Sequence, residues 1–255
     1  MPEGDTVYRA AQNLNTVLAG RTLVRCDIRV PAYATVDLTG ERVDEVISRG
    51  KHLLTRVGDQ TIHTHLKMDG SWHIYRPGVR WRRPHWQARI ILANSEWEAV
   101  GFQLGIVEVL PQYAENTVVG HLGPDLLGPD WDAEVALQRL LATPDAPVGT
   151  ALLDQSVMAG IGNVYRNELC FLRGLLPTRP VAEVPQPEKL VDLAHRLINA
   201  NKNRTNRTTT GNLRGVTSWV YGRDGKPCLR CGTMIVRGSV GDPPRDTYWC
   251  PSCQR

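Results

Sequence analysis

The pattern of hydrophobic and polar residues divides the chain into a β-rich first half and a helical second half. Apolar side chains recur every three or four positions in "TVYRAAQNLNTVL", which predicts an amphipathic helix with Asp5 as its N-cap and Gly20 just past its end. Eight short stretches rich in β-branched and aromatic residues follow: "TLVRCDIRV", "RVDEVI", "KHLLTRV", "TIHTHL", "SWHIYR", "WQARIILA", "WEAVGF" and "GIVEVL". This spacing predicts an antiparallel β-sandwich or barrel behind a leading helix.

The pattern becomes helical after a turn-rich linker, "HLGPDLLGPD". "DAEVALQRLLA" predicts a helix capped by Asp132, and "PEKLVDLAHRLINA" predicts one with Pro187 near its first position. Between them, "AGIGNVYRNELCFLRG" predicts a helix that has Asn163 as N-cap and ends near Arg173. Glycines before a helix start leave backbone N–H groups accessible, so this segment is either a phosphate site or an ordinary capped helix.

Bulk composition is that of a globular protein, since 42% of the residues are hydrophobic. No apolar run approaches the roughly 20 residues needed to cross a bilayer. The first residues lack the basic start and apolar block of a signal peptide. We therefore expect a soluble cytoplasmic protein.

Basic residues concentrate between Arg196 and Arg237. This stretch holds nine Lys or Arg and one acid, Asp224, so it carries +8 while the whole chain carries +4. A basic segment on a mildly acidic body indicates a polyanionic partner such as nucleic acid; a solvated basic face is the alternative.

Four of the six cysteines lie close to the C-terminus, spaced C-x2-C, eighteen residues, C-x2-C. Two such pairs suit one tetrahedral Zn²⁺, and disulfides are disfavoured in a cytosolic chain. Four protein ligands leave no open position, so the metal is expected to be structural. The ligands are Cys228, Cys231, Cys250 and Cys253.

The chain opens with "MPEGD". Removal of Met1 would expose Pro2 as a secondary amine with a pKa near ~8, able to attack a sugar C1′ and form an iminium ion. Glu3 beside it is a candidate proton donor. The alternative is that Pro2 and Glu3 merely open the first helix.

Read together, these motifs resemble the formamidopyrimidine-DNA glycosylase and endonuclease VIII family over nearly the whole chain. The resemblance is carried by "PEGD", "GKHLL", "HLKMDGSW", "LLDQSVMAGIGNVYRNE", "VYGRDGKPCLRCGT" and "RDTYWCPSCQ". It implies an α+β protein: an N-terminal β-sandwich with a leading helix, a helix–two-turn–helix domain and a C-terminal zinc-finger β-hairpin. We place these domains at residues 1–124, 125–215 and 216–255.

The resemblance also implies roles for single residues. Pro2 would be the Schiff-base nucleophile and Glu3 the general acid. Lys51, at a predicted hairpin turn, would assist base loss and β-elimination. Arg245 would grip phosphate and assist δ-elimination, and Asn163 would bind phosphate.

A damaged base must leave the stack before it can react, and an apolar side chain then fills the gap. By the resemblance Met68 is that wedge, Lys67 contacts DNA and His65 contacts phosphate; a buried core position is the alternative for Met68. Two positions depart from the family pattern. Thr6 stands where many relatives carry glutamate, and "FQLG" stands where an "RRFG"-like loop is usual.

The "PEGD" start and a short segment between residues 210 and 220 favour the endonuclease VIII branch. The resemblance thus implies a monomeric, bifunctional DNA glycosylase and AP lyase that acts on oxidised bases, mainly pyrimidines, in duplex or single-stranded DNA. Two alternatives are an 8-oxoguanine-type glycosylase and a non-catalytic zinc-finger protein that binds damaged DNA.

Overall fold

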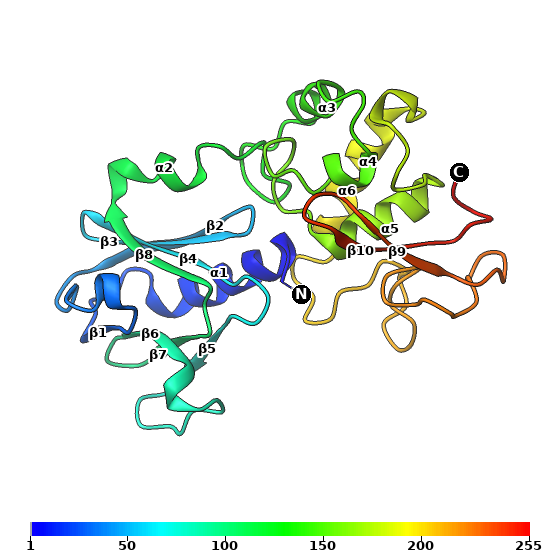
Figure 1. Cartoon of the computed structure of the whole chain (residues 1–255). Helices are drawn as coiled ribbons and strands as arrows, with labels where there is room; N and C mark the ends of the chain where they lie inside the picture. Colours follow the sequence, from blue (N-terminus) through cyan, green and yellow to red (C-terminus); the bar gives the residue numbers. More distant parts are fainter. Residues whose placement is uncertain (1) are drawn as a thin grey trace. The chain divides into compact units, whose positions relative to one another are not determined.

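The computed structural model describes residues 2–255. The chain folds into two compact units, and the boundary between them lies between His121 and Leu122. The first unit consists of one long helix and two four-stranded antiparallel sheets, ordered β1-β6-β7-β5 and β2-β3-β4-β8 (Figure 1). All eight predicted strands are present. Their bounds are β1 (Arg25–Ile28), β2 (Val43–Arg49), β3 (His52–Val57), β4 (Gln60–His65), β5 (Ser71–Tyr75), β6 (Ala88–Ala93), β7 (Glu98–Phe102) and β8 (Ile106–Pro111).

The core of the first unit lies between the two sheets and α1 (Gly4–Leu18). Buried residues of α1, such as Leu14, join Ile62 of β4 and Ile90 of β6 in one apolar cluster. The two sheets do not close on each other through shared strands, so the architecture is a sandwich and the barrel alternative is excluded.

Helix α1 begins earlier than its polar pattern predicts. Glu3 is extended (φ −132°, ψ −174°) and stands at the N-cap, while its carbonyl accepts from the backbone N–H groups of Thr6 (2.9 Å) and Val7 (3.1 Å). The prediction that Asp5 caps the helix is therefore wrong. The Asp5 carboxylate instead accepts from Thr6 N inside the first turn. Gly20 follows the helix with φ +75°, as predicted.

The second unit combines a helical cluster with a two-stranded hairpin. Its helices are α3 (Ala133–Leu141), α4 (Val148–Ala151), α5 (Asn163–Arg173) and α6 (Pro187–Asn199), and its strands are β9 (Val236–Val240) and β10 (Arg245–Trp249). Figure 1 shows the hairpin beside α5. Short helices elsewhere in the chain are α2 (Asn116–Val119), η1 (Pro31–Tyr33), η2 (His85–Gln87), η3 (Gln112–Ala114) and η4 (Val181–Glu183).

Helix boundaries in the second unit follow their local signals with one exception. Asp132 caps α3 by accepting from two backbone N–H groups, and Pro187 occupies the first turn of α6. Helix α5 ends before Gly174 (φ +70°). Its N-cap, however, is Gly162, so the prediction that Asn163 caps it is wrong. Asn163 is the first helical residue because its side chain is engaged elsewhere, as described below.

Two separate apolar clusters lie in the second unit. One is shared by the helices and includes Leu140, Leu169 and Leu190; the other surrounds the hairpin and includes Ile235 and Tyr248. The division of this unit at residue 215 stays a prediction. Over residues 2–255, no helix is long and apolar enough to cross a membrane.

Candidate active site

The start of the chain places two of the predicted reactive groups side by side. Pro2 is half-buried and directly precedes Glu3, whose side chain is fully buried at the first turn of α1. The backbone bonds of Glu3 to α1 fix this arrangement against the sandwich. Met1, whose removal would expose the Pro2 nitrogen, lies outside the described residues.

Lys51 lies where the sequence predicts a turn. Gly50 and Lys51 form a two-residue connection between β2 and β3, closed by the pairing of Arg49 with His52. Gly50 takes φ +58°, a conformation that glycine adopts without steric cost. The hairpin therefore presents Lys51 at the end of the sheet.

A hydrogen-bonded chain runs across the adjoining strands. His52 Nδ1 lies 2.8 Å from His63 Nε2, and His63 Nδ1 lies 3.0 Å from Glu108 Oε2. A carboxylate only accepts, so His63 donates to Glu108 through Nδ1. This bond places a hydrogen on Nδ1 of His63 and orients the ring toward His52. Glu108, which lies opposite His63 in the β4–β8 pairing, is a residue that the sequence analysis missed.

Burial and neighbouring basic groups keep His52 and His65 neutral. Burial is the largest cause that lowers the pKa of His52 to about 3, and the neighbouring histidines and Lys67 lower it further. Burial, Lys67 and Lys51 lower the pKa of His65 to about 4. His65 Nδ1 accepts from the backbone N–H of Lys67 (2.9 Å), so its Nε2 carries the hydrogen. A neutral N–H donor is thus available near Lys51.

Two turns pack together at the edge of the first unit. Lys67 has φ +50°, and a Cβ on Gly105 would lie 2.2 Å from Lys67 Cγ, so glycine is needed there. Gly105 N also donates to the carbonyl of His65 (3.0 Å). Met68, on the tip, is 58% exposed, which excludes the alternative that it is a core methionine.

In the second unit, α5 is tied to β10 by polar side chains. Asn163 Nδ2 donates to the carbonyl of Asp246 (2.9 Å), and Arg166 Nη2 donates to the same carbonyl and to Thr247 Oγ1, both at 2.8 Å. Asn167 Oδ1 accepts from Tyr248 N (2.7 Å). These bonds place Asn163 next to the strand that begins at Arg245, which is exposed.

Glu168 is a second residue that sequence reasoning missed. Its side chain is fully buried and accepts from Thr209 Oγ1 and from the backbone N–H groups of Trp219 (2.7 Å), Val220 (2.9 Å) and Tyr221 (2.9 Å). It fixes the segment that leads into the zinc finger. The polar run "RNE" within an otherwise apolar helix was the available signal.

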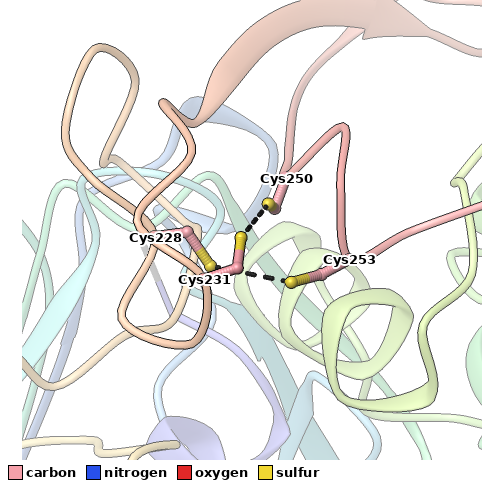
Figure 2. A group of neighbouring side chains, drawn as sticks. All are labelled: Cys228, Cys231, Cys250 and Cys253. Carbon is pink, nitrogen blue, oxygen red and sulfur yellow. Dashed lines mark hydrogen bonds between the residues drawn. The ribbon is translucent and has the colours of Figure 1, made fainter.

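The four cysteines converge on one point (Figure 2). All their sulfur atoms lie within 4.8 Å of one another. The Sγ atoms of Cys228 and Cys253 are 3.9 Å apart, and those of Cys231 and Cys250 are 3.5 Å apart. Tetrahedral Zn–S bonds of about 2.3 Å require separations of about 3.8 Å, so the sulfurs fit one Zn²⁺ with four protein ligands.

The surroundings of the Cys231 and Cys253 thiols shift their pKa values in opposite directions. Hydrogen bonds from Thr233 lower the pKa of the Cys231 thiol to about 6, whereas desolvation raises that of Cys253 to about 12.

Three family models match successive parts of the chain. "Formamidopyrimidine-DNA glycosylase N-terminal domain" matches residues 1–102, "Formamidopyrimidine-DNA glycosylase H2TH domain" residues 122–204, and "Zinc finger found in FPG and IleRS" residues 225–255. The third match agrees with the four-cysteine zinc site.

Relatives and solved structures agree with these matches. "Probable endonuclease 8 2" of Streptomyces coelicolor is 55% identical over 260 residues, covering 100% of this chain and 94% of that protein. "DNA-(apurinic or apyrimidinic site) lyase Nei2" of Mycolicibacterium smegmatis is 54% identical over 255 residues, covering 100% and 99%. A Lactococcus lactis Fpg structure with abasic-site DNA shares the fold at a TM-score of 0.84 and 20% identity, covering 100% of both chains. The chain therefore belongs to the formamidopyrimidine-DNA glycosylase and endonuclease VIII family.

Proposed function

We propose that the protein is a bifunctional DNA N-glycosylase and AP lyase of base excision repair that removes oxidised bases, mainly pyrimidines. Membership of the family and relatives named endonuclease 8 and AP lyase support this activity. The observation that carries it is the full burial of Glu3, which directly follows Pro2 in the chain and stands at the N-cap of α1. We further propose that it works as a monomer in the cytoplasm, on chromosomal DNA.

Pro2 is the nucleophile in this proposal. Once Met1 has been removed, its nitrogen is a secondary amine with a pKa near ~8, and a useful fraction is unprotonated at neutral pH. Its lone pair forms a bond to C1′ while the bond from C1′ to the damaged base breaks and the base leaves with a proton. The product is a cyclic aminal, which becomes an iminium ion when the bond from C1′ to the ring oxygen breaks.

Glu3 and Lys51 act on the sugar and the leaving base. Glu3 gives a proton to the ring oxygen as the sugar opens, and Lys51 assists departure of the base and the first elimination. Each proton transfer of this kind contributes about 10²–10⁴-fold to a rate.

The iminium ion then drives strand cleavage. It acidifies the C2′ proton, whose loss breaks the C3′–O bond; a second elimination breaks the C5′–O bond. Arg245 holds phosphate and assists this second step, while Asn163 and His65 bind other phosphates. Met68 fills the gap left by the flipped base and Lys67 contacts DNA beside it. The zinc ion maintains the hairpin that carries Arg245.

Borohydride trapping tests the role of Pro2. The protein with Met1 removed should form a covalent adduct with a duplex that contains an abasic site or 5-hydroxyuracil. Pro2→Gly, also with Met1 removed, should trap at least about 10²-fold more slowly. Equal trapping by this variant, or no adduct from the unaltered protein, would sink the assignment.

A Glu3→Gln variant separates the two activities. It keeps the Pro2 amine, so it should still trap a preformed abasic site while base excision falls by about 10²–10⁴-fold. Equal loss of both reactions would mean that Glu3 does not act as the proton donor. A panel of oxidised pyrimidines, 8-oxoguanine and hydantoins then tests the proposed preference for pyrimidines.

A further inference from the structure

An arginine-rich segment joins β5 to β6 in the first unit and takes no part in the proposed chemistry. Its sequence is "RPGVRWRRPHWQAR", residues 76–89, with five arginines and neither Asp nor Glu. We call it the basic segment. Its arginines are Arg76, Arg80, Arg82, Arg83 and Arg89.

The basic segment is anchored on the outer face of a sheet. Trp81 is only 9% exposed; its ring stacks on His85 at 4.2 Å and meets the edge of Phe102 at 5.7 Å. Trp81 Nε1 also donates to Glu98 Oε1 (2.5 Å). These contacts hold the backbone of the basic segment in place, so its exposed side chains extend from a fixed backbone.

Two of the five arginines are already engaged. Arg76 lies over the Trp97 ring at 3.7 Å and 3.8 Å from Glu96, and Arg83 donates to Gln103 Oε1 (2.8 Å). Gln103 N in turn donates to the carbonyl of Gln87 (2.8 Å). The basic segment is therefore joined directly to the β7–β8 turn.

The other three arginines carry uncompensated charge. Arg80, Arg82 and Arg89 are exposed, and none forms an ion pair with any carboxylate of the described part of the chain. Arg83 and Arg82 together lower the pKa of the nearby His73, after the larger effect of burial. Positive charge thus accumulates here without an internal partner.

Trp86 is the most exposed tryptophan side chain of this segment, at 77%. An indole that remains in water gains nothing from the core, but it offers a flat face on which a base can stack. Arginines around an exposed aromatic ring are the combination that binds a nucleic-acid strand, with phosphates on the cations and bases on the ring. A strand supplies regularly spaced phosphates for the arginines together with bases for the ring, which favours it over an acidic protein surface.

We propose that Arg80, Arg82, Arg89 and Trp86 form a nucleic-acid-binding surface for an undamaged strand, which lies with its phosphates on the arginines and one accessible base on Trp86. In Figure 1 the connection between β5 and β6 lies away from the start of α1, which carries Glu3 at its N-cap. The strand that binds this surface does not need to contain a damaged base.

A lesion-free, fluorescently labelled oligothymidine tests this surface in the full-length zinc-loaded protein. Anisotropy titrations at several salt concentrations give the Kd and its salt dependence. Trp86→Ala should weaken binding about tenfold, and Trp86→Phe, which keeps a ring, should recover most of the loss. The combined variant Arg80→Gln/Arg82→Gln/Arg89→Gln should lower the slope of log K against log salt by about 2.

Matched controls use groups of the same kind elsewhere in the first unit. Tyr113→Ala removes an aromatic ring that is 90% exposed, and Arg42→Gln removes an exposed arginine; both should bind like the unaltered protein. Wild-type Kd and salt slope in the Trp86→Ala and triple-arginine variants would overturn the proposal. The proposal would also be overturned if polyglutamate displaced the labelled oligothymidine as effectively as unlabelled oligothymidine does at the same concentration of negative charge.

Borohydride trapping of an abasic site in a short duplex, at saturating protein, accompanies each variant. Unchanged trapping together with weakened strand binding supports a surface separate from the reactive groups. Loss of trapping in proportion to loss of strand binding would assign these residues to the reaction site and overturn the proposal. Failure of the unaltered protein to trap would refute the proposed chemistry but leave the oligothymidine result intact.

Discussion

The two units hold their functional side chains in different ways. In the first unit, a continuous apolar core supports two sheets, and the candidate reactive groups stand on turns and on the chain end outside it. In the second unit, the residues that hold the hairpin and the segment leading into the zinc finger are themselves buried and polar: Arg166, Asn167 and Glu168 are all 0% exposed. The apolar cluster beneath the hairpin includes two of the zinc ligands, Cys228 and Cys250.

This difference predicts different consequences of losing one polar side chain. In the first unit, removal of a turn residue should cost activity and leave the fold intact. In the second unit, loss of one polar side chain should unfold part of the structure before it affects activity. The small apolar cluster adds little to the free energy of unfolding, so most of the stability must come from the metal and from buried hydrogen bonds. Four experiments test this contrast.

Zinc removal should have the largest effect. A structural zinc ion contributes on the order of 10 kcal/mol to a small domain. Cys250→Ser, or chelation, should therefore abolish amide protection in β9 and β10 while β3 and β4 stay protected, as measured by hydrogen exchange with mass spectrometry. Cys26→Ser, on strand β1, is the matched control and should keep both zinc and protection. A hairpin that stays protected without zinc would show that its apolar cluster suffices.

Glu168→Gln should have the next largest effect. One carboxylate oxygen becomes an NH2 group that faces N–H or O–H donors, so at least one buried donor loses its acceptor. We expect the second unit to lose about 3 kcal/mol, seen as a lower urea midpoint with an unchanged m-value. Glu188→Gln, at an exposed position on α6, is the control. A loss below about 0.5 kcal/mol would show that the second unit does not depend on buried polar contacts for its stability.

Sequence alone predicted the features whose signals are local. The short stretches rich in β-branched and aromatic residues, the Asp132 cap and the spacing of Cys228 and Cys231 each lie within a few residues, and the structure confirms all three. The helix starts at Asp5 and Asn163 were mispredicted although their signals are also local. At both places a polar residue that could cap the backbone is engaged in another contact.

What the sequence could not predict depends on pairing between distant segments. Glu108 reaches His63 only because β8 lies beside β4, and Glu168 meets residues 209–221 only after the chain returns past α5. Neither residue differs in type from a surface glutamate. Their roles follow from register and burial, which a single sequence does not reveal.

Mild acid should weaken the first unit through its histidines. His52 and His65 have folded pKa values of about 3 and about 4 and an ordinary value of 6.5 once unfolded. Between pH 6.5 and 4 the unfolded chain therefore binds protons that the folded chain does not, and stability falls as pH falls. After allowance for solvent screening, we expect a loss of about 2 kcal/mol between pH 7 and 5.

Urea unfolding followed by amide exchange on β3 and β4 measures this loss separately from zinc release in the second unit. The double variant His52→Gln/His65→Gln should be less stable at pH 7 but should show a flatter pH profile. His85→Gln, at an exposed ring, should retain the wild-type slope. A double variant with an unaltered slope would show that other groups carry the acid sensitivity.

The exposed ion pair of the hairpin should have the smallest effect. Arg237 meets both carboxylate oxygens of Asp246 at 2.9 Å, yet both side chains are 51% exposed. Because water screens such pairs, Arg237→Gln should lower the urea midpoint at low salt only slightly. The loss should shrink further at 1 M salt, where the Debye length is about 3 Å. Arg196→Gln, which removes another exposed pair from α6, should behave alike. Arg237→Gln should differ from Glu168→Gln only if burial decides how much a polar contact stabilises the second unit. Equal losses of stability in the two variants would show that exposed polar contacts stabilise this unit as much as buried ones do.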